Sequence, residues 1–280
     1  MNEGNYSMST SIEGVKHIIA VASGKGGVGK STTAMNLAVT LSVQGLKVGL
    51  LDADIYGPSQ PRMLNVKDAK PESDGQRIEP VVSNGIKLMS IGFLMEEDAP
   101  VVWRGPMVQS SLMQMLFNVN WGELDVLILD MPPGTGDTQL SISQKVSLSG
   151  AVIVSTPQDI SLIDAKKGLN MFKKVNVPII GIVENMSMFI CPNCDHESHI
   201  FGHGGAVEAA KELGVDVLAQ IPLDLEIRHK TDTGYPVILT MPDSKQAQIY
   251  RDFASKVASY LEQYEKQKKG SVKIVFEESA

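Results

Sequence analysis

The feature that most constrains this chain is a glycine-rich segment near its N-terminus. Residues 24–31 have the sequence GKGGVGKS and fit the phosphate-loop pattern G-x-x-x-x-G-K-[ST]. The segment follows an apolar run at 18–22 and opens a helix-compatible run at 30–43. Glycines let successive backbone N–H groups turn towards phosphate oxygens, and the following helix adds the positive end of its dipole. This order of strand, loop and helix favours a site for nucleotide phosphates over a glycine-rich turn without a ligand.

The polar side chains of this segment have different expected roles. Lys30 is expected to neutralise the β- and γ-phosphates, and the Ser31 hydroxyl to complete a magnesium shell. Lys25, five positions earlier, is either a solvated loop residue or a second cation that favours charge separation as the γ-phosphate leaves. The predicted nucleotide-binding stretch consists of Gly24, Lys25, Gly26, Gly27, Val28, Gly29, Lys30, Ser31 and Thr32.

Strand-like and helix-like segments alternate along most of the chain. Apolar runs predict strands at 16–23, 46–54, 86–93, 124–130, 151–156, 178–183 and 215–221. Helix-like runs predict helices at 30–43, 107–117, 138–145, 161–175, 205–213 and 244–266. This alternation is typical of an α/β protein with a doubly wound, mostly parallel sheet flanked by helices. Ligands of such sheets bind at the carboxyl ends of the strands.

The pattern predicts a single phosphate-loop domain over residues 15–266. We expect a flexible N-terminus at 1–14 and a C-terminal tail at 267–280, in which residues 272–276 form either a short edge strand or part of the tail. Segments without a regular pattern, which we expect to be loops, lie at 55–85, 96–106 and 185–203.

Composition bounds the class of protein. A chain of 280 residues with 43% hydrophobic and 20% charged residues is typical of a soluble globular protein with a large core. The formal net charge of −7 gives no reason to expect a nucleic-acid partner. No apolar run approaches the length of a membrane span, and the polar N-terminus with Glu3 does not suit a secretory signal. We therefore expect a cytoplasmic protein without a membrane partner.

Acidic residues end two neighbouring strands of the predicted sheet. Asp130 closes an apolar run, as does the acid that holds magnesium in phosphate-loop enzymes, although such an acid can also cap the next turn. Asp52 and Asp54 end the strand at 46–54. The carboxyl ends of parallel strands lie at one edge of a sheet, so we expect these acids near the phosphate loop. The chain has no N-K-x-D motif for guanine, which favours ATP.

The chain has two cysteines, and both lie in one C-x-x-C motif. Cys191 and Cys194 are clustered, unlike the spread cysteines of a secreted disulfide framework, which suggests metal or redox chemistry in a reducing compartment. Two thiolates at this spacing can bind one metal ion or metal cluster. The alternatives to a cluster are a zinc site with His196 and His199, a thioredoxin-like redox pair, and two inert thiols. A four-iron cluster commonly takes four thiolates, so two chains facing each other would satisfy the count.

The segment 25–31 resembles the K-G-G-x-G-K-[ST] signature of the deviant Walker A ATPases, which include partition, septum-positioning and nitrogenase iron-protein families. In that group the early lysine reaches the nucleotide of the opposite subunit, so the resemblance implies an ATP-dependent homodimer with catalytic roles for Lys25 and Lys30. It implies that Asp54 positions the attacking water and that Asp52 supports the magnesium shell with Asp130. It also implies that Asn185 contacts adenine, although a turn asparagine is the competing interpretation.

Two further motifs narrow this resemblance. The sequence D-x-P-P-G-T-G-D occurs at 130–137, and C-P-x-C follows N-M-S at 185–187. Both resemble the Mrp/ApbC branch of iron–sulfur cluster carrier ATPases. This resemblance implies a slow ATPase that holds a [4Fe–4S] cluster between Cys191 and Cys194 of two subunits and transfers it to apo-proteins. The alternatives are a MinD/ParA-type positioning or partition ATPase and a zinc-binding phosphate-loop ATPase.

Overall fold

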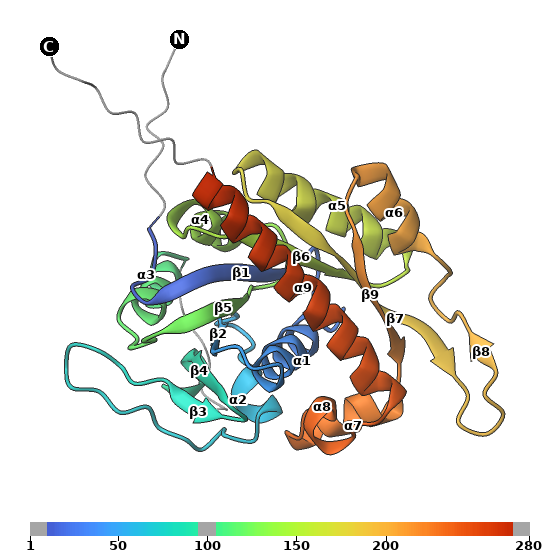
Figure 1. Cartoon of the computed structure of the whole chain (residues 1–280), viewed down its shortest axis with the longest axis horizontal. Helices are drawn as coiled ribbons and strands as arrows, with labels where there is room; N and C mark the ends of the chain where they lie inside the picture. The colour runs from blue at the N-terminus through green and yellow to red at the C-terminus, as the bar shows by residue number, and fades with distance from the viewer. Residues whose placement is uncertain (1–9, 95–104, 271–280) are drawn as a thin grey trace, which may run out of the picture.

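A computed structural model describes residues 10–94 and 105–270 of the chain (Figure 1). The described strands are β1 (Val15–Ser23), β2 (Val48–Asp52), β3 (Val81–Ser83), β4 (Ile86–Ser90), β5 (Leu124–Asp130), β6 (Gly150–Ser155), β7 (Ile179–Ile190), β8 (Glu197–Ser198) and β9 (Val217–Leu223). The described helices are α1 (Lys30–Val43), α2 (Gln60–Met63), α3 (Gly105–Phe117), α4 (Asp137–Lys145), α5 (Asp159–Lys174), α6 (Gly205–Leu213), α7 (Leu225–Thr233), α8 (Val237–Thr240) and α9 (Lys245–Gly270), with a 3₁₀ turn at Ile91–Phe93.

The described strands form one sheet in the order β3-β4-β2-β5-β1-β6-β7-β8, and β9 also pairs with β7. Six pairings, from β4–β2 through to β7–β9, are parallel, whereas β3 and β8 run antiparallel to their neighbours. The central strands are buried along almost their whole length, as expected for a parallel sheet covered on both faces. The predicted doubly wound, mostly parallel α/β fold is therefore confirmed.

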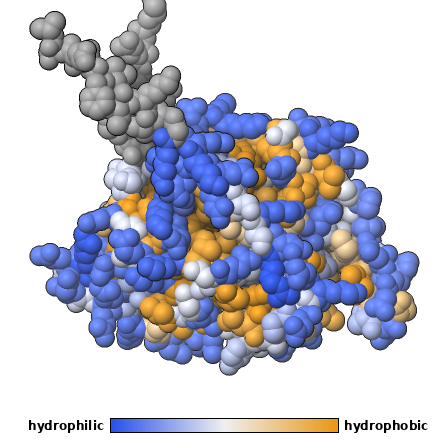
Figure 2. All heavy atoms as spheres, viewed as in Figure 1, coloured by the Kyte–Doolittle hydropathy of each residue, from blue (hydrophilic) through white to orange (hydrophobic). Residues whose placement is uncertain are grey.

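Helices with one apolar side cover the sheet. In Figure 1, α9 crosses the front of the sheet diagonally beside α1, with which it packs. Its buried stripe includes Tyr250, Phe253, Val257 and Leu261, which follow helical spacing. The outer face of α9 is mostly hydrophilic in Figure 2. Across the described ranges, 10–94 and 105–270, no helix has the length and apolar character needed to cross a membrane.

Strand β7 differs from its prediction. It was expected to end at residue 183 and to be followed by a loop at 185–203, but it continues to Ile190. In the extension, Glu184 and Asn185 pair with β9, and Phe189 and Ile190 pair with the short β8. These pairings give its backbone N–H and C=O groups hydrogen-bond partners. Met186 has a φ of 56° within a shift of register, so a bulge interrupts the strand there. Buried polar side chains at this bulge hid the strand from a search for apolar runs.

Several short elements escaped the sequence pattern. The predicted loop at 55–85 contains α2 and β3, and α7 and α8 lie in a region without a predicted element. Asp224 begins α7 by accepting hydrogen bonds from the N–H groups of Glu226 (2.8 Å) and Ile227 (3.0 Å), and Gly234 ends it with a φ of 77°. These are ordinary capping signals, but α7 buries few side chains and so lacks an apolar stripe.

The start of the described chain is also packed. Residues 10–14 were expected to belong to a flexible N-terminus, but the Thr10 N–H donates to the Lys145 carbonyl (2.8 Å) and the Ser147 N–H donates to the Thr10 carbonyl (3.1 Å). Ile12 is buried in the core. Helix α9 continues through residues 267–270. The remaining predictions for the N-terminus, the loop at 96–104 and the tail from 271 fall outside the described residues.

Candidate nucleotide site and cysteine hairpin

The phosphate loop joins β1 to α1, as predicted, and needs its glycines for two reasons. Gly27 and Gly29 have φ values of 78° and 80°, a left-handed conformation that favours glycine. A Cβ atom on Gly29 would also lie 2.0 Å from the Asn185 side-chain nitrogen. Gly24 has a different constraint, because a Cβ there would lie 2.2 Å from the backbone of Asp164 in α5. The loop is therefore shaped by close packing as well as by backbone conformation.

Side-chain hydrogen bonds fix this loop from both ends. The Ser23 hydroxyl donates to the Lys25 carbonyl (2.8 Å), and the Asn185 side-chain amide donates to the Val28 carbonyl (2.9 Å). Asn185 is buried and lies within β7, so it is not the turn asparagine of the competing interpretation. It supports the loop and does not line the cavity beside it. A contact between Asn185 and adenine remains a prediction.

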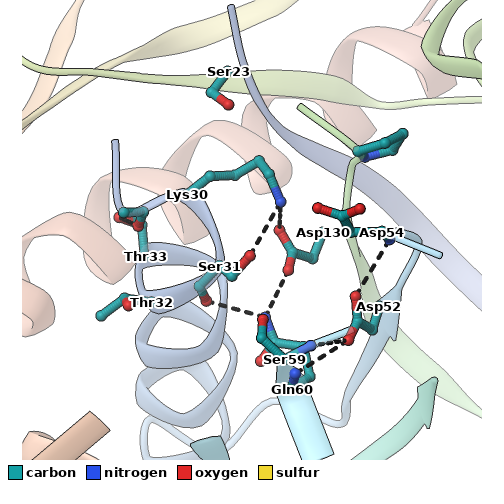
Figure 3. Close-up of polar contacts among 12 residues, drawn as sticks. Ser23, Lys30, Ser31, Thr32, Thr33, Asp52, Asp54, Ser59, Gln60 and Asp130 are labelled. Carbon is teal, nitrogen blue, oxygen red and sulfur yellow. Dashed lines mark hydrogen bonds and ion pairs between the residues drawn. The ribbon is translucent and has the colours of Figure 1, made fainter. Parts of the chain in front are cut away.

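Lys30 and Asp130 form a buried ion pair at the start of α1. The Lys30 ammonium contacts Asp130 Oδ1 and the Ser31 hydroxyl oxygen, the latter at 3.1 Å (Figure 3). The Lys30 side chain is 6% exposed and that of Asp130 is fully buried. Burial makes each charge depend on the other, because an unpaired buried charge is strongly destabilising. The pair therefore holds the phosphate-binding lysine against the end of β5.

Asp52 holds the segment that follows β2. Its carboxylate accepts hydrogen bonds from the Ser59 N–H (2.9 Å), the Gln60 N–H (3.1 Å) and the Ser90 hydroxyl (3.1 Å). Burial and the nearby Asp130 charge raise the pKa of Asp52 to about 7, although the hydrogen bonds act in the opposite direction. The carboxylate oxygens are thus engaged by the protein itself. The expected role of Asp52 in a magnesium shell remains a prediction.

Asp54 lies two residues beyond Asp52, at the wall of a cavity. Its backbone N–H donates to Asp52 Oδ1 (3.3 Å). Burial raises the pKa of Asp54, and the Lys30 charge partly offsets this rise. A carboxylate beside a phosphate-binding lysine is suitably placed to accept a hydrogen bond from an attacking water. Its catalytic role is nevertheless a prediction.

A cavity of about 370 Å³ lies at the carboxyl edge of the sheet, between the phosphate loop and the segment after β2. The predicted residues that line it are Gly26, Gly27, Gly29, Lys25, Lys30, Ser31, Thr32 and Asp54. Ser59, Arg62, Thr231 and Asp232 also line it and were missed, because the elements that carry them have no apolar stripe. The structure therefore assembles most of the predicted site and adds α7 to its wall.

The residues of this cavity fit a magnesium nucleotide by three observations. Gly26 and Gly27 line the cavity and have open space where a Cβ would lie, so side chains at these positions would fill part of it. The Ser31 hydroxyl and the Asp130 carboxylate are hard oxygen donors, the kind that magnesium prefers. One buried acceptor, the Gln60 side-chain oxygen, has no hydrogen-bond partner. Together they provide anion-binding and cation-binding groups side by side.

The cysteines lie in a hairpin beyond the end of β7 and do not line the nucleotide cavity. The Cys191 N–H donates to the His196 carbonyl (3.0 Å), and the Asp195 N–H donates to the Cys191 carbonyl (2.9 Å). Both thiols are free; Cys191 is partly exposed and Cys194 is exposed. Hydrogen bonds from the N–H groups of Asn193 and Cys194 lower the pKa of Cys191. The hairpin therefore presents two accessible thiols, and the lowered pKa of Cys191 favours its thiolate form.

The proposed zinc set of Cys191, Cys194, His196 and His199 is not assembled. His199 instead lies 3.3 Å from the Ser187 carbonyl and contacts the ring of His203. Within residues 10–94 and 105–270, no three histidine, cysteine or acidic side chains are grouped so that they could hold a metal ion. One chain thus offers the two cysteines alone at this place.

Several known proteins are similar to this chain in sequence. The family model of the ParA group described as NUBPL iron-transfer P-loop NTPase matches residues 14–258. The chain is similar to the iron-sulfur cluster carrier protein of Salmonella typhimurium, with 55% identity over 89% of this chain and 68% of the relative. It is equally similar to the iron-sulfur cluster transfer protein NUBPL of Mus musculus, with 55% identity over 89% of this chain and 79% of the relative.

A solved structure resembles the fold closely. The nucleotide-binding protein of Archaeoglobus fulgidus in complex with ADP has 41% sequence identity and a TM-score of 0.71, covering 79% of this chain and 88% of that one. The family match includes the phosphate loop, the three strand-end acids Asp52, Asp54 and Asp130, and the cysteine hairpin. The chain therefore belongs to the family of NUBPL iron-transfer P-loop NTPases.

Proposed function

We propose that this protein hydrolyses ATP slowly and carries a [4Fe–4S] cluster, which it transfers to apo-proteins. The observation that carries the proposal is the joint presence of a phosphate-loop cavity and an accessible pair of reduced cysteines on one sheet. Relatives named iron-sulfur cluster carrier or transfer proteins, more than half identical in sequence, support it. The cluster is cargo rather than a resident group.

The nucleotide half of the proposal assigns roles to four side chains. Lys30 binds the β- and γ-phosphates after it leaves Asp130, and the Ser31 hydroxyl and Asp130 hold magnesium. When bound, magnesium neutralises charge on the phosphates. Asp54 positions the attacking water, and in this class of reaction positioning is most of the catalysis. The ADP complex of the Archaeoglobus relative supports the choice of an adenine nucleotide.

Lys25 supports a dimer in this proposal. Within the described part of the chain, its ammonium has no hydrogen bond or ion pair, although it lines the phosphate cavity. A lysine that is not engaged by its own chain is available to the nucleotide of a second copy. Such a cation would stabilise the charge that develops as the γ-phosphate leaves.

The cargo half of the proposal depends on ligand count. A four-iron cluster commonly takes four thiolates, and Cys191 and Cys194 supply two from each chain. Two copies related by a twofold axis supply four, so the cluster bridges a homodimer. Both thiols are accessible, which lets a second copy approach them. The same accessibility lets an apo-protein with its own thiolates take the cluster by ligand exchange.

Strand β7 offers a route between nucleotide and cargo. Asn185 in this strand contacts the phosphate loop through Val28, and Cys191 follows directly after the strand ends. The bulge at Met186 lies between them. A change in the loop on nucleotide binding would thus reach the cysteine hairpin through six residues of backbone. We propose that ATP controls cluster release by this path.

The expected compartment is the cytoplasm, where thiols remain reduced, and the bacterial relatives support it. No membrane or nucleic-acid partner is needed for the proposed reaction. A MinD/ParA-type positioning or partition switch is the competing function, but it assigns no role to the two exposed thiols. A zinc-binding ATPase would use them, but it lacks further ligands among the residues that the structure describes.

Anaerobic reconstitution tests the cargo assignment. The parent protein and the variants Cys191→Ala and Cys194→Ala are incubated with iron and sulfide, and cluster uptake is followed by visible absorbance. We expect uptake by the parent and loss of most uptake in each variant, with zinc absent from the same preparations. Full uptake by both variants would exclude these ligands, and one zinc per chain bound by the cysteines would favour the zinc ATPase.

A transfer assay tests the link to ATP. The loaded protein is mixed with an apo-enzyme that needs a [4Fe–4S] cluster, in the presence or absence of Mg·ATP, and recovery of the recipient's activity is measured. We expect Mg·ATP to change the transfer rate in the parent and not in Lys30→Met. Equal rates with and without nucleotide in the parent would contradict the proposed coupling.

A further inference from the structure

Gln60 is a fully buried polar residue at the start of α2, beside the proposed magnesium site. Its side-chain N–H₂ donates to Asp130 Oδ2 (2.8 Å) and to the Ser31 carbonyl (3.0 Å), as Figure 3 shows. Its backbone N–H donates to Asp52 (3.1 Å). We refer to the two side-chain hydrogen bonds as the Gln60 bridge. The bridge joins the segment after β2 to both β5 and α1.

Chemistry fixes the orientation of this amide. Asp130 Oδ2 and the Ser31 carbonyl are both acceptors, so the N–H₂ group must face them. Turning the amide over would place its oxygen against a carboxylate and a carbonyl. The present orientation leaves the Gln60 oxygen buried without a hydrogen-bond partner. Buried polar atoms nearly always have partners in proteins, so this oxygen is available to a water or ligand bound at the site.

The bridge conflicts with a metal-bound site. Lys30 contacts Oδ1 of Asp130 and Gln60 contacts Oδ2, so each oxygen of this carboxylate already has one partner. An acid that holds magnesium, directly or through water, holds it more strongly when other donors do not compete for its oxygens. Nucleotide phosphates can draw Lys30 away, because they offer it a better anionic partner. That frees Oδ1, whereas the Gln60 amide keeps its hold on Oδ2, and only the metal competes for this second oxygen.

We propose that Gln60 is a positioning residue that competes with magnesium for Asp130 and couples metal binding to the segment carrying Asp54. In the metal-free protein the bridge ties residues 53–63 to β5 and α1. When magnesium binds with the nucleotide, the Gln60 amide would leave Asp130, which removes the side-chain tie to β5 while the hydrogen bonds to Asp52 remain, and Asp54 could then adjust its position. This inference rests on the proposed nucleotide function and identifies how that site distinguishes a nucleotide with magnesium from one without it.

Nucleotide affinity with and without metal tests the bridge. Calorimetry gives the dissociation constant for ADP in excess magnesium and in EDTA for the parent, Gln60→Met and the control Asn36→Leu. Asn36 is also a buried amide with an unpaired oxygen, but its amide donates to a backbone carbonyl of α1 and contacts no acid. Methionine matches the length of glutamine and cannot compete for Asp130.

The measured quantity is the factor by which magnesium increases ADP affinity. We expect this factor to be about ten times larger in Gln60→Met than in the parent, because a hydrogen bond to a charged group no longer has to be broken. Asn36→Leu should match the parent. Gln60→Glu, which adds a negative charge beside Asp130, should increase the effect of magnesium further. An unchanged or smaller effect in Gln60→Met would overturn the proposal. A parent that binds no ADP would instead refute the proposed function.

A spectroscopic measurement on the unmodified protein gives a second test, which does not depend on how the variants fold. In ¹⁵N-labelled protein the Gln60 side-chain N–H₂ resonances are followed on addition of ADP in EDTA and then of magnesium. We expect slow solvent exchange and little change with ADP alone, followed by a shift and faster exchange with magnesium. Resonances that respond fully to ADP in EDTA, or stay unchanged with magnesium, would contradict the metal-dependent release.

Discussion

At the scale of single residues, the two lysines of the phosphate loop show what sequence spacing can and cannot predict. Spacing placed Lys30 beside a strand-end acid, and the structure pairs it with Asp130. The same spacing placed Lys25 in the loop but could not reveal that its ammonium lacks a partner within the described residues. Gln60 and Asp232 carried no sequence signal, because buried amides and cavity acids follow no periodic pattern.

Replacing Lys30 tests the buried ion pair. Lys30→Met keeps much of the apolar stem but leaves the Asp130 carboxylate buried without its cation. We expect a loss of about 3 kcal/mol or more in the free energy of unfolding, measured by urea denaturation in EDTA. Adding Asp130→Asn to this variant should restore part of that loss. Equal stabilities of the parent and the Lys30→Met protein would contradict the inferred pairing.

Replacing Lys25 tests its action on a second copy. Lys25→Ala should bind ADP about as well as the parent, because Lys30 and the loop backbone remain. Its ATP hydrolysis should fall roughly 100-fold, the usual effect of removing one group that stabilises transition-state charge. Steady-state phosphate release and calorimetry measure the two properties. A large loss of ADP affinity with normal hydrolysis at saturation would show that Lys25 acts within its own chain.

At the scale of elements, the long buried strands and the helices with apolar stripes were predictable, and the short capped elements were not. Helix α1 begins and ends where the pattern predicted, because a glycine loop and an apolar stripe delimit it. Strand β7 extends past its prediction because Glu184 and Asn185 are buried polar residues, whose partners lie elsewhere in the chain. Tertiary hydrogen bonds of this kind cannot be inferred from local sequence.

The contact between β1 and α9 gives a prediction for acid stability. His17 of β1 is buried, lies 3.3 Å from the Ser149 hydroxyl and packs edge-on against Tyr264 of α9. Burial lowers the pKa of His17 below its ordinary value, an effect that the nearby Glu265 partly opposes. The folded state therefore disfavours the charged ring. Stability is retained above the unfolded pKa of about 6.5 and is lost as the pH falls towards the folded pKa.

The variant His17→Asn keeps a hydrogen-bonding group near Ser149 and does not titrate. Between pH 7.5 and pH 5.5 the parent should lose up to about 1 kcal/mol more of its free energy of unfolding than this variant. Urea denaturation at both pH values measures the difference, and the carboxylates common to both proteins cancel. Parallel losses in the two proteins would show that His17 is not held neutral.

At the scale of the whole molecule, the alternation of apolar and helix-like runs predicted the α/β fold, and the phosphate loop with the D-x-P-P-G-T-G-D and C-P-x-C motifs predicted the family. The sequence did not predict that the nucleotide cavity and the cysteines line different surfaces, as they do in the structure. It could not show that the cysteine hairpin is anchored to β7, and hence to Asn185. That connection arises from strand pairing between residues far apart in the chain.

The central claim is that one chain supplies half of a cluster site. Native mass spectrometry of the anaerobically reconstituted protein tests it most directly, because it reports chain count and metal content for the same particle. The account predicts a species with two chains and one [4Fe–4S] cluster, and its loss in Cys191→Ala. A single chain that carries a complete four-iron cluster would contradict the claim.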